Sequence, residues 1–266
     1  MSNGIKLSFL PLGSITCDTN ALVAFATRAT ALNPAPVCKF EPFPIWAAYI
    51  ETPTKKILFD TGLCENCLTG GEPESTKVNI PISFKEGENL EHQLSLLGVN
   101  PEEIDYVIIS HLHHDHAGKI GLFKNAKIIV QRREMARALM DTHTVNPMGT
   151  YLKADLEVDA KWTLIDGDTE LMPGVKLLVP GHAEGQQALQ LELDRLGTVL
   201  LTSDACYTEL NWGPPMRPAG ALDDSKAYFA SLKKLHAIAE ATNATVFFGH
   251  DIAQFETLRK APDYYD

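Results

Sequence analysis

The stretch IDYVIISHLHHDHAG, residues 104–118, places a short apolar run directly before a cluster of imidazole and carboxylate side chains. Its first half is rich in apolar and β-branched residues and predicts a buried strand. Its second half carries His111, His113, Asp115 and His116 on the loop that leaves this strand. Because binding and catalytic groups often lie on such loops, we interpret this loop as a candidate functional site.

The composition of this loop indicates a metal site. A lone histidine is usually solvated, but five ionisable groups at positions 111–116 would lose hydration and repel one another without a cation. Zinc and similar ions bind imidazole nitrogen together with carboxylate oxygen, which is the donor set here. In an extended segment His111 and His113 point the same way, and the Asp-His pair that follows can turn toward a second ion.

Three more candidate ligands follow apolar runs elsewhere in the chain. His182 follows VKLLVPG, Asp204 follows TVLLTS, and His250 follows TVFFG. Taken singly, each has an ordinary alternative role as a turn, cap or loop residue. Their common position after predicted strands indicates that together they complete two coordination spheres.

Strand and helix patterns are mixed along the 266 residues, which predicts a layered α/β protein forming one domain over residues 1–266. Helices are expected from Leu90 to Leu97, ended by Gly98, and from about Asp224 to Ala241. The region Gly62–Lys85 is too long for a simple turn and is expected to form a lid or a pocket wall. Strand-like runs begin at Lys6, Ile45, Lys56, Asp105, Ala126, Val175, Ala188, Thr198 and Thr245.

Charge and composition exclude several classes of partner. A formal net charge of −11 disfavours nucleic acid and anionic membrane surfaces. The chain has no apolar run of about 18 residues and no signal-like N-terminal region, so we expect a cytoplasmic protein. Five irregularly spaced cysteines favour reduced thiols over a disulfide framework. A small-molecule substrate is expected, with the protein a monomer or a homodimer.

With these residues in place, the chain resembles the metallo-β-lactamase superfamily and, within it, the N-acyl-homoserine lactonases. The resemblance implies a four-layer αβ/βα sandwich and two zinc ions per chain, with cobalt, manganese or iron as alternatives. It implies that His111, His113 and His182 hold one ion, that Asp115, His116 and His250 hold the other, and that Asp204 bridges them. The motifs that carry the resemblance are LFDTG (58–62), SHLHHDHAG (110–118), PGVKLLVPGH (173–182), LLTSDACYT (200–208) and FFGHDIAQF (247–255).

The implied reaction is hydrolysis of the lactone ring of N-acyl-homoserine lactones by a hydroxide that bridges the two ions, which is quorum quenching. Tyr207 matches the family tyrosine whose phenol faces the substrate carbonyl or leaving oxygen; an ordinary buried aromatic is the alternative. Asp115 is expected to assist proton transfer, and Asp60 to orient a ligating histidine or to stabilise a turn. The chain departs from the family pattern where a Gly-His pair is common, because Gly185 is followed by Gln186.

Other functions remain open at this point. The same metals would serve another lactonase, an esterase, a β-lactamase or a thioesterase resembling glyoxalase II. Net charge disfavours an RNA phosphodiesterase, and an oxygen-reducing di-iron protein usually has Glu where His113 stands. A non-enzymatic alternative is a ligand-sensing protein on the same fold, which retention of all seven ligands disfavours.

Overall fold

The computed structural model describes residues 3–70, 74–144, 150–179, 185–220, 222 and 224–266. Within this part, the larger sheet has the strand order β4-β1-β2-β3-β5-β6-β7 and the smaller one the order β12-β11-β10-β9-β8. The strands of the larger sheet are β1 (Lys6–Asp18), β2 (Phe40–Glu51), β3 (Lys56–Phe59), β4 (Ile82–Ser83), β5 (Tyr106–Ile108), β6 (Lys127–Gln131) and β7 (Lys161–Ile165). Those of the smaller sheet are β8 (Thr169–Met172), β9 (Val175–Leu178), β10 (Ala188–Leu193), β11 (Gly197–Leu201) and β12 (Thr245–Phe247).

Parallel pairing within each sheet brings the candidate ligands to one edge. In the larger sheet β3, β5 and β6 run parallel, so the segments after their carboxyl ends lie side by side. In the smaller sheet β11 and β12 are also parallel, which aligns the segments that follow Leu201 and Phe247. Asp60, His111, Asp204 and His250 each come shortly after one of these strands.

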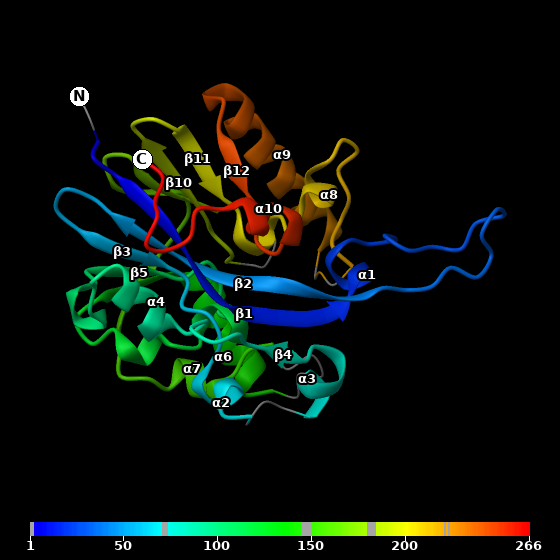
Figure 1. Cartoon of the computed structure of the whole chain (residues 1–266), viewed down its shortest axis with the longest axis horizontal. Helices are drawn as coiled ribbons and strands as arrows, with labels where there is room; N and C mark the ends of the chain where they lie inside the picture. The colour runs from blue at the N-terminus through cyan, green and yellow to red at the C-terminus, as the bar shows by residue number, and fades with distance from the viewer. Residues whose placement is uncertain (1–2, 71–73, 145–149, 180–184, 221, 223) are drawn as a thin grey trace.

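The two sheets lie face to face, with helices on their outer sides (Figure 1), and apolar side chains fill the layers between and outside the sheets. One buried cluster includes Phe9 and Phe59 of the larger sheet with Leu189 and Phe247 of the smaller, so it lies between the two sheets. A second cluster covers the other face of the larger sheet, and further clusters lie beneath helix α9 (Ser225–Thr242) on the smaller sheet. Because both faces of each sheet are covered, many strands are apolar throughout, and the predicted four-layer α/β arrangement is confirmed.

The two predicted helices are present, with the expected ends. α4 (Leu90–Leu96) is followed by Gly98 at φ +68°, a left-handed conformation that glycine adopts without strain. α9 (Ser225–Thr242) begins after Asp224, whose carboxylate accepts the N–H groups of the first turn. The remaining α-helices are short: α1 (Thr19–Leu22), α2 (Glu65–Leu68), α3 (Glu74–Asn79), α5 (His114–Ala117), α6 (Arg132–Thr142), α7 (Lys153–Leu156), α8 (Glu209–Trp212) and α10 (Ile252–Thr257).

Some elements were not predicted from the sequence. β7 and β8 lie at the ends of their sheets and are largely half-buried, so they lack the continuous apolar runs that mark the central strands. The described part of the region 62–85 contains α2, α3 and the short strand β4. All five cysteines are free thiols, as predicted.

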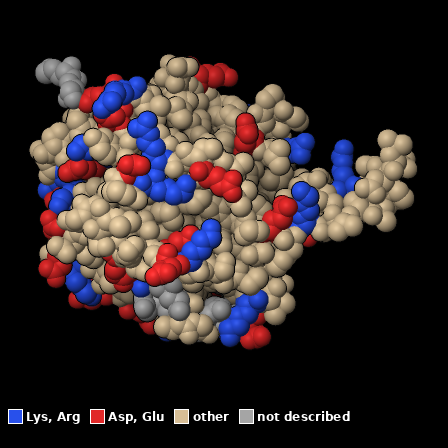
Figure 2. Space-filling model, viewed as in Figure 1, with Lys and Arg blue, Asp and Glu red and all other residues tan. Residues whose placement is uncertain are grey.

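The surface carries both acidic and basic side chains, as the composition predicts. Acidic and basic side chains are interspersed on the face drawn in Figure 2, without a basic patch spreading across it. Across the described residues, no helix is both long enough and apolar enough to cross a membrane.

Candidate metal centre

Asp60 holds His116 in one orientation. Its Oδ2 lies 2.9 Å from His116 Nδ1, and its Oδ1 accepts the Ser110 N–H at 2.7 Å. A carboxylate only accepts hydrogen bonds, so His116 Nδ1 carries the proton and its Nε2 presents a lone pair. The sequence-based expectation that Asp60 orients a candidate histidine ligand is therefore confirmed for His116.

His250 and His111 are oriented by the same principle. Nδ1 of His250 donates to the carbonyl oxygen of Pro44 at 2.8 Å. Nδ1 of His111 lies 3.0 Å from Ser110 Oγ, and that hydroxyl donates to Asp60 at 2.8 Å, so it accepts from the histidine. In both rings Nε2 therefore presents its lone pair on the opposite side.

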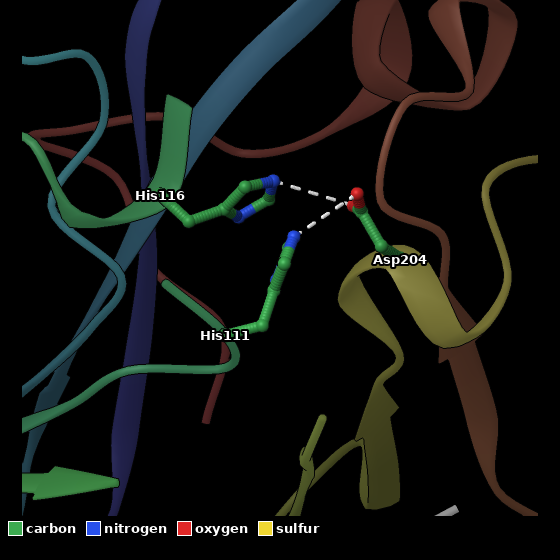
Figure 3. A group of neighbouring side chains, drawn as sticks. All are labelled: His111, His116 and Asp204. Carbon is green, nitrogen blue, oxygen red and sulfur yellow. Dashed lines mark ion pairs between the residues drawn. The ribbon is translucent and has the colours of Figure 1, made fainter. Parts of the chain in front are cut away.

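The three Nε2 atoms converge on the carboxylate of Asp204. Its Oδ2 lies 3.4 Å from His111, and its Oδ1 lies 3.3 Å from His116 and 3.0 Å from His250. Figure 3 shows His111 and His116 pointing at Asp204, which approaches from the smaller sheet. Asp115 completes the cluster, with Oδ2 at 3.5 Å from His116 Nε2 and 3.9 Å from His250 Nε2.

This arrangement fits a divalent cation. The Nε2 atoms of His111 and His116 and Oδ1 of Asp204 are buried and lack hydrogen-bond partners. Lone pairs of imidazole and carboxylate facing one another at such distances repel, and burial increases that repulsion because water is excluded. A cation among them turns the repulsion into attraction. Two groups of three residues each have their donor atoms within 4.8 Å of one another. The first group is His111, His116 and Asp204, and the second is Asp115, His116 and His250.

The field inside the cluster also favours positive charge. Burial lowers the pKa of His116 and His250, but the charges of Asp204 and Asp115 outweigh it and raise both above the ordinary histidine value. Without a metal ion these imidazoles therefore favour a second proton on Nε2, and a metal ion would displace that proton when it binds. Burial likewise raises the pKa of Asp204, but the neighbouring imidazoles hold it well below the usual carboxyl range. Burial also raises the pKa of Asp115, but His116 outweighs it and holds this pKa below the usual range. Both carboxylates are therefore ionised at neutral pH, in the form that binds metals.

The structure brings some, but not all, of the predicted metal ligands together. His111, Asp115, His116, Asp204 and His250 meet as described, and Asp204 lies between the others as a bridge would. The two groups share His116, whereas the predicted spheres assign His111 and His116 to different ions. His182 lies outside the described residues, so its predicted ligation stays a prediction.

His113 belongs to neither group. Its ring packs against His111, with centroids 4.4 Å apart, and against Tyr151 at 4.7 Å. Burial and the neighbouring His111 lower the pKa of His113 well below its ordinary value, so its ring is neutral. It is adjacent to the cluster and its ligation stays a prediction.

Tyr207 lies next to the cluster. Its ring centroid is 5.6 Å from that of His250, and its backbone carbonyl accepts the His250 N–H at 2.8 Å. Burial and the charge of Asp204 raise the pKa of Tyr207 well above its ordinary value. The phenol therefore stays protonated and can donate a hydrogen bond beside the cluster.

Several supporting residues were not found by sequence reasoning. The Ser203 hydroxyl donates a hydrogen bond to the Ser110 hydroxyl at 2.9 Å and so links the two sheets. Glu134 accepts the Leu112 N–H at 2.8 Å. Pro44 contributes only a carbonyl oxygen, which its residue type does not signal. A partial signal existed for Ser110 and Ser203, since both adjoin predicted ligands.

A close backbone approach at Gly249 sets the position of His250. A Cβ atom at Gly249 would lie 2.7 Å from the Ser203 carbonyl oxygen and 3.2 Å from Asp204 Oδ1. Only glycine lets the segment after β12 pass this close to Asp204.

Comparison with known proteins places this geometry in a family. A family model described as the Metallo-beta-lactamase superfamily matches residues 40–250. The chain is 36% identical to the N-acyl homoserine lactonase AiiB of Agrobacterium fabrum, over 98% of each chain. It is 35% identical to the N-acyl homoserine lactonase AiiA of Bacillus thuringiensis subsp. kurstaki, over 97% of this chain and 98% of that protein.

A solved structure of similar fold has a product in its metal site. It is an N-acyl homoserine lactone hydrolase with N-hexanoyl-L-homoserine bound at its catalytic metal center. The two chains share 34% identity with a TM-score of 0.85, covering 99% of this chain and 100% of the other. From its strand order, its converging imidazoles and these full-length similarities, the chain belongs to the metallo-β-lactamase superfamily, in the group whose curated members are named N-acyl homoserine lactonases.

Proposed function

We propose that this protein hydrolyses the lactone ring of N-acyl homoserine lactones, a quorum-quenching activity. The observation that carries the proposal is the convergence of three imidazole lone pairs on the buried Asp204 carboxylate, which calls for cations. Full-length similarity to proteins named N-acyl homoserine lactonases supports the choice of substrate.

The proposed ligands are His111, His113 and His182 for one zinc ion, Asp115, His116 and His250 for the other, and Asp204 between them. Cobalt, manganese or iron can fill the same donor set. Bound ions of this kind supply a water acidic enough to attack near neutral pH and a polarised substrate carbonyl.

The chain's own residues act on the substrate and its protons. The protonated Tyr207 phenol donates a hydrogen bond to the carbonyl oxygen, where negative charge develops as water adds. The ring C–O bond then breaks, and Asp115 passes a proton from the attacking water to the leaving oxygen. Asp60 keeps His116 in the ligating orientation throughout, through the hydrogen bond to Nδ1.

The test combines elemental analysis with a substrate panel. Wild-type protein is expected to contain two divalent ions per chain and to open acyl homoserine lactones, with product detected by mass spectrometry. Asp204→Ala and His250→Ala are expected to lose metal and activity together, because each removes a buried ligand. His92→Ala serves as the matched control, since His92 is exposed on α4 and distant from the cluster in sequence.

The panel also distinguishes the alternatives. It includes a simple ester, a thioester and a β-lactam beside the lactones. Turnover of the thioester without turnover of any lactone overturns the proposal in favour of a thioesterase. Two bound ions with no turnover of any compound favour a ligand-sensing protein.

A further inference from the structure

Gln186 is fully buried at the point where the chain enters β10. Family members often have histidine after this glycine, and the metal cluster as described does not include Gln186. Gly185, just before it, packs so closely on α6 that an added Cβ would lie 2.2 Å from the backbone nitrogen of Glu134. The backbone leading into Gln186 is therefore held against a rigid element.

The side chain of Gln186 reaches the turn that carries Asp204. With the amide oxygen facing that turn, it accepts the N–H of Asp204 at 2.8 Å and the N–H of Ala205 at 2.5 Å. The opposite orientation would set the amide NH₂ against these two donors, so the oxygen is the atom that faces them. One buried acceptor thus serves two consecutive backbone donors.

That turn needs outside support. It is the short 3-10 helix η3 (Ser203–Ala205), whose first N–H groups, including that of Asp204, lack partners within the helix. The Ala205 N–H donates to the Thr202 carbonyl at 3.2 Å as well as to Gln186. Ser203 also has φ +46°, a left-handed conformation that is strained for a non-glycine residue. Such strain persists only where surrounding contacts hold the backbone in place.

We propose that Gln186 is a positioning residue for Asp204. By binding two N–H groups of η3, it holds the Asp204 carboxylate among the imidazoles of His111, His116 and His250. The role of that carboxylate as a metal bridge rests on the proposed function, but the hydrogen bonds themselves do not. A neutral histidine has one acceptor nitrogen, so it would bind only one of the two donors.

The experiment measures amide hydrogen exchange in the metal-free protein, by NMR, for wild type, Gln186→Met and Gln131→Met. Methionine keeps the side-chain length but removes the acceptor. Gln131 is the matched control because it is also a buried glutamine with several hydrogen bonds, which go to Gly167 and Gln187 rather than to η3. The Asp204 amide is expected to exchange about tenfold faster in Gln186→Met, the equivalent of losing about 1.4 kcal/mol of protection. The Ala205 amide is expected to accelerate less, because it keeps its hydrogen bond to the Thr202 carbonyl. In Gln131→Met the exchange of both amides is expected to match wild type.

Metal affinity is the second measurement, made by chelator competition. Gln186→Met is expected to bind metal about 10–100-fold more weakly, with kcat reduced more than KM is changed. Gln186→Glu restores two acceptor positions and is expected to recover the amide protection, and Gln186→His to recover only part of it. These two variants also test the inference if Gln186→Met does not fold.

If the exchange rates of the Asp204 and Ala205 amides are unchanged in Gln186→Met, the inference is overturned. It is also overturned if these rates rise equally in Gln131→Met. Failure of the proposed function is a separate result, because wild-type protein would then open no lactone while the amide protection stayed dependent on Gln186.

Discussion

Tyr207 differs from the other candidate catalytic groups because its phenol stays protonated without the help of a metal ion. Its ring lies beside His250, and burial together with the Asp204 charge keeps the phenol protonated. Tyr207→Phe is expected to lower kcat about 10²–10³-fold, the usual cost of losing one donor to a developing oxyanion. Bound metal, measured by elemental analysis, should be unchanged. Tyr264→Phe, at an exposed tyrosine, is the control, and an unaltered kcat for Tyr207→Phe would remove the residue from the mechanism.

Asp60 orients the neighbouring His116 by a hydrogen bond, and its backbone has a conformation that is rare for a non-glycine residue. Its φ of +62° is a left-handed conformation for a non-glycine residue, and its carboxylate accepts from both Ser110 and His116. Asp60→Asn is expected to weaken metal binding about 10–100-fold, because an amide has one acceptor atom and its NH₂ would face a donor. Chelator competition measures this loss. Asp263→Asn, at an exposed aspartate, should bind metal as wild type does; equal affinity in Asp60→Asn would contradict the orienting role.

At the scale of elements, α7 contributes a buried acid to the wall of a cavity of about 200 Å³ that Cys64 and Lys119 also line. This acid is Asp155, whose side chain is 4% exposed and whose Oδ2 has no hydrogen-bond partner. Burial raises the pKa of Asp155 to about 7. The folded protein therefore keeps this carboxyl protonated at pH values where the unfolded chain has already ionised it.

The contribution of Asp155 to the free energy of unfolding should therefore decrease as pH rises from about 4 to about 7 and then level off, since the folded state binds the extra proton in this range. Asp155→Asn removes the ionisation, so it is expected to raise the free energy of unfolding at pH 8 and to leave it nearly unchanged at pH 4. Urea unfolding at both pH values measures the difference. Asp159→Asn, at an exposed position, should show no such pattern, and a pH-independent effect of Asp155→Asn would refute the explanation.

Across the whole molecule, the cluster joins the two sheets, since Asp60 and His111 come from one and Asp204 and His250 from the other. Any ligand that binds only the folded state raises stability in proportion to the logarithm of its free concentration. Metal removal with a chelator is therefore expected to lower Tm, and added zinc to restore it in a concentration-dependent way. Calorimetry on wild type and Asp204→Ala provides the comparison: the variant's Tm should respond little to zinc, and an equal response would place the stabilising ion elsewhere.

Much of the fold could be predicted from local pattern. The central strands are buried on both faces, so their apolar runs were recognisable, and α9 was predicted nearly to its ends from its helical periodicity. The edge strands β7 and β8 were not predicted, because half-buried positions leave no continuous apolar signal. The two-sheet arrangement came from the family resemblance, since strand order depends on long-range pairing that periodicity does not encode.

The chemical character of the site could be predicted from the order of residues alone, because the candidate ligands immediately follow strands that local apolar pattern predicts. How these ligands act together depends on contacts between segments far apart in the chain. The proton on His250 is placed by Pro44, which is 206 residues away, and the turn of Asp204 is held by Ser110 and Gln186 from other segments. The reason is physical: a hydrogen bond depends on distances of a few tenths of an ångström, and packing of the two sheets sets those distances.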